Sequence, residues 1–236
     1  PRRYPCRAEG GSGGWSHFHF DITCRQPSGK WGSEDAYAYA WEAYVNQYKP
    51  GLIAVARPHH LAATGEKVIL DGSKSVSFAA VIKEYQWIFS DGSRGNGPVQ
   101  TRVYSRPGTY SEILRVADSA GNVDYDFATV NVADPKAPGR LPPTIHAAFF
   151  PTFGIRAGDP VTFKVRTFRT GPGNETWDFG DGSAPVYSSS NPEGVHAEDG
   201  YAAVVHRFAK PGRYVVQVTR SGESGPATAH VDVAVE

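Results

Sequence analysis

The stretch that decides the fold is residues 176–183, which read TWDFGDGS. It recurs 90 positions earlier as residues 86–93, QWIFSDGS, which follow directly after Tyr85. In that earlier copy Tyr85, Trp87 and Phe89 alternate, so three aromatic rings fall on one face of a β-strand and point into a core. Both copies continue with Asp-Gly, a dipeptide typical of tight turns. The pattern predicts a buried strand leading into a hairpin turn, twice in one chain.

A second pair of motifs extends the repeat. Residues 106–110 (RPGTY) recur 104 positions later as residues 210–214 (KPGRY), so the second copy carries about 14 extra residues between its two motifs. These extra residues, roughly Ser188 to Gly200, are mostly polar or turn-forming and predict an exposed loop. Both copies end alike, in Val-Asn-Val at 130–132 and Val-Asp-Val at 231–233. Short alternating strands between turn signals predict an all-β sandwich in each copy.

In this order the motifs resemble those of the PKD (polycystic kidney disease) domain, an immunoglobulin-like β-sandwich. That family is recognised by Trp-x-Phe-Gly-Asp-Gly, then a Pro-Gly-x-Tyr turn and a closing Val-x-Val strand. Residues 177–182 match the first motif fully, and residues 87–92 match it except at Ile88 and Ser90. Residues 65–73 (GEKVILDGS) also resemble the opening strand and turn of the family.

The resemblance sets the predicted organisation of the chain. We predict a mostly β protein with two tandem immunoglobulin-like (PKD) sandwiches, over residues 52–134 and 143–236. A Pro-rich linker over residues 135–142 joins them as a semi-rigid spacer.

The first segment, residues 1–51, differs from the rest because it is rich in aromatic residues and Gly. It predicts one helix over about residues 33–48, with Ser33 as its N-cap, acidic residues in its first turn, and Lys-Pro-Gly at 49–51 as its stop. An aromatic stripe follows the helical spacing and is expected to pack in a core: Tyr37, Trp41, Tyr44 and Tyr48. We interpret this segment as a junction that ends an upstream domain.

Composition excludes several classes of protein. Lys+Arg and Asp+Glu are equal at 24 each, so there is no electrostatic reason to expect nucleic-acid binding. No stretch approaches the roughly 20 apolar residues that a membrane span needs. The chain begins with Pro and contains no Met, which suggests a piece of a longer precursor.

The two cysteines, Cys6 and Cys24, lie close together in the sequence. A disulfide between them would close a loop of about 19 residues and stabilise the fold by roughly 3 kcal/mol. The alternative is two free thiols in a reducing compartment. We predict the disulfide, because PKD domains are typically secreted, and with it a secreted or cell-surface location.

One string of residues is a candidate catalytic motif: His17, His19 and Asp21. It resembles the His-x-His-x-Asp of metallo-β-lactamase-type hydrolases, because two His at i and i+2 on a strand point the same way and can share a metal. That family continues with a further His where this chain has Ile22, and its later ligands are missing. The alternative is an alternating strand that buries Phe18 and Phe20.

Candidate binding residues are Trp15, Trp31 and Glu112. Glu112 falls on the inward face of the strand that starts near Tyr110, where a bare carboxylate would be costly. We expect a bulge or shifted register that turns Ile113 inward instead; a buried partner such as Arg, or a binding groove, are the alternatives. Calcium is a candidate ligand of the oxygen-rich turn that contains Asp118, Asn122 and Asp124, and we expect no other cofactor.

These features predict a non-catalytic spacer or binding module of a secreted multidomain protein, attached to an extracellular hydrolase. Its partners would be an upstream domain or another chain of the same precursor, and a polysaccharide or protein ligand. We expect no enzyme in this chain on its own. Two alternatives stay open: the remnant of a hydrolase whose site uses His17, His19 and Asp21, and bead-like structural domains of a surface layer or filament.

Overall fold

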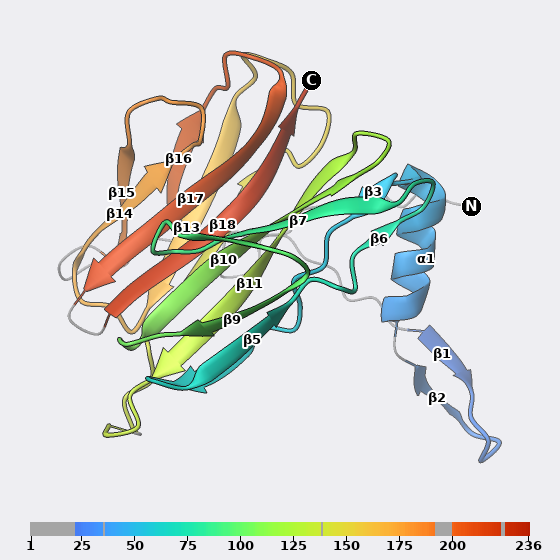
Figure 1. Ribbon diagram of the computed structural model, residues 1–236, viewed down its shortest axis with the longest axis horizontal. Coiled ribbons are helices and arrows are strands. Elements are labelled where there is room, and N and C mark those ends of the chain that lie inside the picture. The colour runs from blue at the N-terminus through green and yellow to red at the C-terminus, as the bar shows by residue number, and fades with distance from the viewer. Residues whose placement is uncertain (1–21, 35, 138, 192–199, 223–224) are drawn as a thin grey trace. The chain divides into compact units, whose positions relative to one another are not determined.

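The computed structural model describes residues 22–34, 36–137, 139–191, 200–222 and 225–236 (Figure 1). The chain divides into two compact units, Pro1–Gly51 and Leu52–Glu236, and each is described by itself. The prediction of a mostly β chain with two sandwiches is confirmed. No helix among these residues has the length and apolar character needed to cross a bilayer.

In the first unit an antiparallel hairpin precedes the helix. Strand β1 (Ile22–Arg25) pairs with β2 (Trp31–Glu34), and helix α1 spans Tyr37–Tyr48. The predicted N-cap is wrong, because Ser33 lies in β2 opposite Thr23 and the helix starts after Ala36 without a side-chain cap. Strand pairing continues as far as Glu34, so neither Ser33 nor Glu34 belongs to the first helical turn. The predicted stop is correct, with Lys49 in a left-handed conformation.

The aromatic stripe of α1 exists, but it is not in a core. Successive rings contact one another, with centroid distances of 6.3 Å, 6.0 Å and 5.2 Å along the series Tyr37, Trp41, Tyr44 and Tyr48. The four side chains are between 38% and 70% exposed. Ring-on-ring contact along one helix face therefore replaces the predicted burial.

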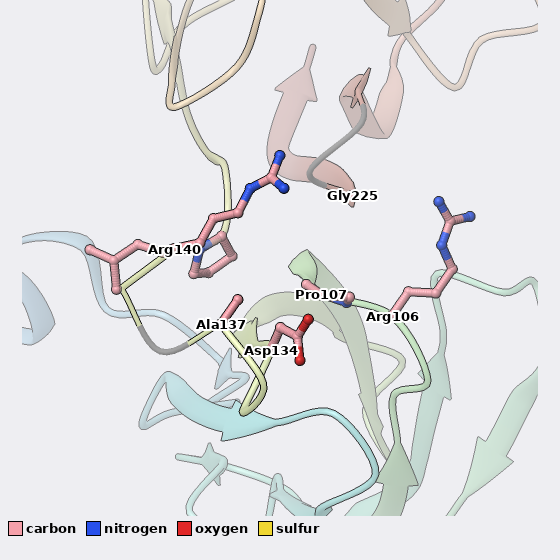
Figure 2. Close-up of a pocket in the computed structure, with 8 residues that line it drawn as sticks. Arg106, Pro107, Asp134, Ala137, Arg140 and Gly225 are labelled. Carbon is pink, nitrogen blue, oxygen red and sulfur yellow. The ribbon is translucent and has the colours of Figure 1, made fainter.

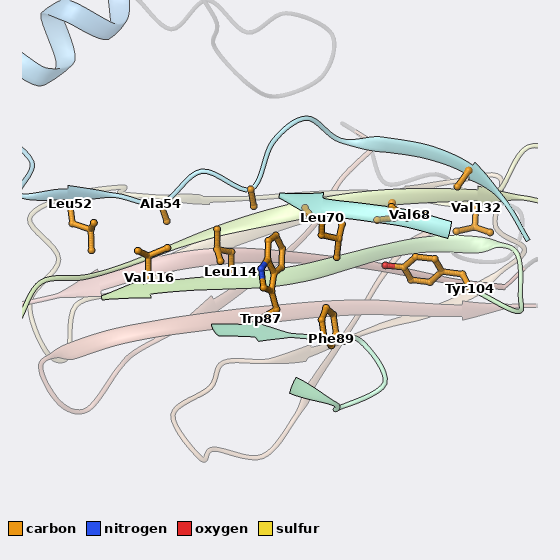
Figure 3. Close-up of a cluster of buried hydrophobic side chains, with 14 residues drawn as sticks. Leu52, Ala54, Val68, Leu70, Trp87, Phe89, Tyr104, Leu114, Val116 and Val132 are labelled. Carbon is orange, nitrogen blue, oxygen red and sulfur yellow. The ribbon is translucent and has the colours of Figure 1, made fainter. Parts of the chain in front are cut away.

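The first sandwich contains nine short or medium strands. They are β3 (Leu52–Ile53), β4 (His60–Ala63), β5 (Lys67–Asp71), β6 (Val76–Ser77), β7 (Ile82–Ile88), β8 (Arg94–Asn96), β9 (Val99–Val103), β10 (Gly108–Asp118) and β11 (Val123–Ala133). One sheet has the order β8-β7-β10-β11-β4, and β5 pairs with β9 in the facing layer. Figure 3 shows Val68 and Leu70 of β5 facing Trp87 and Leu114 in the core between these layers.

The second sandwich repeats this plan. Its strands are β12 (Thr144–Phe150), β13 (Val161–Phe168), β14 (Gly173–Asp178), β15 (Val186–Asn191), β16 (Ala202–His206), β17 (Gly212–Gly222) and β18 (Gly225–Val235). The order β15-β14-β17-β18 forms one layer and β12-β13-β16 the other. Between them lies an aromatic core of Phe163, Trp177, Phe179 and Phe208. Alternating burial along β13 follows directly from its alternating sequence.

The Asp of each Asp-Gly turn is held in an equivalent way in both sandwiches. Asp91 pairs with Arg102, whose guanidinium lies 4.1 Å from the centre of the Phe89 ring. Asp181 contacts His206 at 2.7 Å, and the His206 ring stacks on Phe179 with centroids 3.8 Å apart. Arg102 and His206 are 104 positions apart, as the second repeat motif is. In each sandwich, therefore, the Phe and the Asp of the repeated motif both contact the same side chain, Arg102 in the first and His206 in the second.

The extra residues of the second copy are only partly outside the core. The predicted exposed loop was to start at Ser188, but β15 continues through Asn191. Ser190 is buried, and its backbone and side chain both donate hydrogen bonds to the buried Glu175. This part of the prediction is wrong because Glu175 requires donors from β15. Residues 192–199 lie outside the described ranges.

Candidate functional site at the junction of the two sandwiches

The two sandwiches meet along one strand from each. Strand β18 runs parallel to β10, with Thr109 opposite Ala227, and this contact joins sheets from both sandwiches. The Thr109 hydroxyl donates to the carbonyl oxygen of Pro143 at 2.6 Å. A methyl group on Gly225 would overlap the carbonyl oxygen of Pro107, so only glycine allows this approach. Thr109 and Ser111, on the outward face of β10, are buried as a result.

His230 of β18 lies at the centre of this contact. Its Nδ1 atom is 2.9 Å from the Ser111 hydroxyl of the first sandwich, and its Nε2 is 3.0 Å from the Gln217 amide. The ring stacks on Phe127 of β11, with centroids 5.4 Å apart. Burial lowers the pKa of His230 to about 4, so the neutral ring is the form that fits.

We expect the buried His230 to make the protein less stable in acid. An unfolded His titrates near 6.5, so unfolding takes up a proton between pH 6.5 and 4. The contribution is present above pH 6.5 and decreases as the pH falls, by about 2 kcal/mol at pH 5. Urea unfolding from pH 4 to 7 measures it. The His230→Gln protein should lose this dependence while the control His60→Gln keeps it; equal profiles for His230→Gln and the unaltered protein would contradict the assignment.

Arg213 connects the two sandwiches at the other end of the contact. It donates to both carboxylate oxygens of Asp232 on its own sheet, and also to Asp124 and to the carbonyl oxygen of Val123 in the first sandwich. Its guanidinium lies 5.4 Å from the centre of the Tyr125 ring. Burial alone would lower the pKa of Arg213, but the carboxylates of Asp232 and Asp124 raise it above its usual value. Arg213 therefore stays charged and bridges the two sandwiches.

Two pockets lie beside the linker at the Gly225 end of the contact. The smaller, of about 260 Å³, is shown in Figure 2, where Asp134 and the linker residues Ala137 and Arg140 lie across from Pro107 and Gly225. The larger, of about 480 Å³, shares Arg140 and Gly225 with it and is also lined by Arg169 and Arg220. Among the described residues that line the larger pocket, every charged residue is an arginine.

Arg220 is an unusual member of this lining. It follows Val216 and Val218 on the inward face of β17 and is 5% exposed. Its two terminal nitrogens donate to the carbonyl oxygens of Asn174 and Gly171, at 2.9 Å and 2.5 Å. Its Nε atom is buried and has no acceptor. No ion pair of Arg220 with a described carboxylate is present.

Comparison with known proteins identifies both sandwiches. Residues 51–133 match one family model and residues 150–235 another, and both are described as the PKD domain. The chain carries two PKD domains in tandem. A curated relative, collagenase ColA of Clostridium perfringens, is 29% identical over 83 residues, which are 35% of this chain and 8% of the collagenase.

Among solved structures, the chain is similar to two PKD1 domains from Vibrio. That of Vibrio anguillarum Epp is 22% identical and the match covers 36% of this chain and 98% of that one, with a TM-score of 0.32. That of the Vibrio cholerae metalloprotease PrtV is 25% identical, with 34% and 90% covered and a TM-score of 0.27.

Several of the sequence-predicted site residues fall outside the described ranges. These are Cys6, Trp15, His17, His19 and Asp21. The disulfide between Cys6 and Cys24 and the metal-binding string therefore stay predictions. Trp31 lies in β2 of the first unit and is 70% exposed, as a binding residue would need to be.

Glu112 lies inside the core of the first PKD domain, and the predicted bulge is wrong. The register of β10 against β11 is regular, with Glu112 opposite Ala128 and Ile113 opposite Phe127. Glu112 is fully buried and accepts hydrogen bonds from the Ser90 amide at 2.7 Å, the Ser90 hydroxyl at 3.0 Å and the Tyr104 hydroxyl at 2.9 Å. Burial raises the pKa of Glu112, and these donors oppose that rise. The alternative of a buried partner is correct in kind, with hydroxyl and amide donors in place of Arg.

The carboxylates of the calcium candidates Asp118 and Asp124 accept hydrogen bonds from other groups of the protein. Asp118 accepts hydrogen bonds from Ser77, from the amides of Ala120 and Asn122, and from the Asn122 side chain. Asp124 accepts from the Ala54 amide and from Arg213. No group of three His, Cys, Asp or Glu side chains within the described ranges could hold a metal ion. Calcium binding in this turn stays a prediction.

The junction residues were missed by sequence reasoning. Strand alternation from Tyr214 through Val216 and Val218 leads to Arg220, so an inward-facing Arg was visible in the pattern, as Glu112 was. Nothing in the pattern of β10 or β18 indicates that the outward faces of two separate domains cover one another. His230 and Arg213 therefore became recognisable as junction residues only in three dimensions.

Proposed function

We propose that this chain is a non-catalytic accessory part of a secreted multidomain hydrolase, in which the two PKD domains act together as one rigid spacer. The observation that carries the proposal is the Arg213 bridge. One guanidinium holds Asp232 of the second domain and Asp124 of the first, in a partly buried setting where charge-assisted hydrogen bonds are strong.

The contact between the domains is long as well as polar. It continues along β18 from Gly225, against Pro107, through His230, against Ser111, to the Arg213 bridge. A domain pair joined only by its linker would move freely, whereas contacts at both ends of one strand oppose bending and twisting. This arrangement favours a spacer of fixed geometry over bead-like domains on a flexible string.

The parent activity is inferred from the relatives. The curated relative matched over 83 residues is a collagenase, and this chain corresponds to 8% of its length. We infer that the catalytic domain lies elsewhere in the precursor and acts outside the cell on protein or polysaccharide. The PKD pair would then hold that domain at a set distance and orientation from its substrate or from a neighbouring module.

Arg213→Ala is the test of the rigid pair. We expect the two domains of the unaltered protein to tumble as one body, with a common rotational correlation time from ¹⁵N relaxation. Loss of Arg213 leaves two partly buried carboxylates without their cation, a change that typically costs roughly 2–5 kcal/mol in an interface. The variant should therefore show shorter and unequal correlation times for the two domains.

Arg102→Ala is the matched control. Arg102 lies on β9 in the facing layer and pairs with Asp91 inside the first domain, so its removal deletes an ion pair away from the junction. Common tumbling should persist in this control. Independent tumbling of the domains in the unaltered protein would refute the rigid spacer.

A further inference from the structure

The larger junction pocket gathers guanidinium groups from three separate segments. Arg140 comes from the linker, Arg169 from the turn after β13 and Arg220 from β17. Arg169 is fixed by two of its nitrogens, because Nε donates to the Pro142 carbonyl at 2.8 Å and one terminal nitrogen to Thr144 at 3.1 Å. Arg169 is thus positioned by the fold and does not depend on a ligand for its place.

Among the residues that the structure describes, no carboxylate forms an ion pair with the buried Arg220, although the buried Glu175 lies on the neighbouring strand β14. Removing a guanidinium from water is costly unless an anion compensates it. Two backbone carbonyls accept hydrogen bonds from Arg220, yet both are neutral and its Nε has no acceptor. A purely structural role, holding the segment Gly171–Asn174, explains the two carbonyl contacts and leaves the buried Nε–H without an acceptor.

The backbone around Arg220 is shaped to admit it. Gly173, the first residue of β14, has a φ of +143°, which favours glycine, and a methyl group on it would overlap the end of the Arg220 side chain. The pocket is also lined by the small or polar residues Thr170, Ser221 and Gly222 and holds about 480 Å³, which is more than one carboxylate or sulfate group requires. The larger pocket therefore combines free volume, hydroxyl groups and arginine side chains.

We propose that this pocket binds an oxyanion, a carboxylate or sulfate group carried by a sugar-sized ligand, through Arg169 and Arg220. Arginine suits this task because its planar fork can donate two parallel hydrogen bonds to one oxyanion. The bound anion would place a negative charge beside Arg220, which forms no ion pair with a carboxylate in the described part of the chain. The site would also lie beside the linker, so an occupied pocket would hold linker and second domain together. The proposal is independent of the spacer role, since binding is measured whether or not the domains tumble together.

The experiment is an anion titration followed by NMR of the arginine Nε–H groups. Sulfate and acetate are added separately to the whole chain, with sodium chloride adjusted to keep ionic strength constant. We expect a saturable shift of the Arg220 signal with at least one of the two ions. Saturation by sulfate alone assigns a sulfate site, and saturation by acetate alone assigns a carboxylate site.

Variants separate a built site from general attraction. Arg169→Gln removes one exposed cation and should weaken binding about tenfold or more, the usual effect of losing a hydrogen bond to a charged group. Arg156→Gln, which removes an exposed Arg elsewhere in the same domain, should leave binding unchanged. Arg220→Lys keeps the charge without the fork and should also weaken binding; circular dichroism checks that it folds. A linear response to both ions, or equal affinity in Arg169→Gln and Arg156→Gln, would overturn the proposal.

Discussion

Trp177→Ala should lower the free energy of unfolding of the second PKD domain by about 3–5 kcal/mol, which approaches the whole stability of a typical domain. Trp177 is fully buried, and its ring lies 5.6 Å from that of Phe163 and 6.2 Å from that of Phe179. Its indole N–H also donates to Ser188 at 3.1 Å. The change would therefore leave a cavity in the aromatic core and remove one of the two hydrogen bonds of the Ser188 hydroxyl, which keeps its bond to Glu175.

Urea unfolding monitored by near-ultraviolet circular dichroism measures the loss. Trp87→Ala should have a similar effect on the first domain, because Trp87 is equally buried and donates to the Pro98 carbonyl. Trp31→Ala is the matched control, since Trp31 is 70% exposed and its loss should change stability by less than about 0.5 kcal/mol. A Trp177→Ala protein that unfolds like the unaltered one would contradict the role of this strand as the centre of the sandwich.

The sandwich cores could be predicted because each depends on local alternation. Trp87 and Phe89, like Trp177 and Phe179, are two residues apart, with each Phe directly after the strand that holds its Trp, and this spacing places both rings in the core. The Pro-Gly-x-Tyr turn behaves likewise in both copies, since the hydroxyls of Tyr110 and Tyr214 each reach the carbonyl four residues earlier. Such contacts join residues of the same motif, so they can be predicted wherever the motif occurs in the sequence.

The features that could not be predicted depend on contacts between distant strands. The N-cap of α1 was misplaced because Ser33 could serve a helix or a hairpin, and pairing with β1 decided for the hairpin. His230 and Ser111 are 119 positions apart and belong to different domains, so no periodicity links them. Strand alternation put Glu112 on the inward face, but a bulge was predicted there, because its donors Ser90 and Tyr104 come from two other segments that the alternation does not reveal.

Comparison of the two copies explains why Glu112 is there. In the second domain Asp178, within the motif, accepts a hydrogen bond from the Gly180 amide at 2.9 Å. The first domain has Ile88 at the corresponding position, which cannot accept one. Glu112 reaches across from β10 instead and takes the equivalent amide, that of Ser90, at 2.7 Å. The buried carboxylate of Glu112 therefore compensates for the loss of the motif's Asp at position 88.

Glu112→Val should lower the free energy of unfolding of the first domain by about 2–4 kcal/mol, although Val occupies the corresponding position, 216, in the second. The change leaves the Ser90 amide and the buried Tyr104 hydroxyl without their acceptor, and each such loss costs about 1–3 kcal/mol. The side-chain volume hardly changes, so a cavity contributes little. Urea unfolding at pH 7 measures the loss.

The decisive comparison introduces into the first domain the residues that the second domain has at the corresponding positions. Ile88→Asp and Tyr104→Phe, added to Glu112→Val, give the amide a local acceptor and remove the orphaned hydroxyl, as Asp178 and Phe208 do in the second copy. This triple variant should return to within about 1 kcal/mol of the unaltered protein. Ile88→Asp alone should give no such gain, because Glu112 already occupies the Ser90 amide.

The pH dependence provides an independent check on the same network. Because burial raises the pKa of Glu112 above that of the unfolded chain, folding retains a proton that the unfolded state releases. This contribution to stability is complete below about pH 4.5, the ordinary range of a Glu, and decreases as the pH rises toward the folded-state pKa. Glu112→Gln keeps an acceptor without the charge and should remove this part of the pH profile. A triple variant as unstable as Glu112→Val, or a Glu112→Gln profile that coincides with that of the unaltered protein, would show that Glu112 does not serve as the substitute for the missing Asp of the motif.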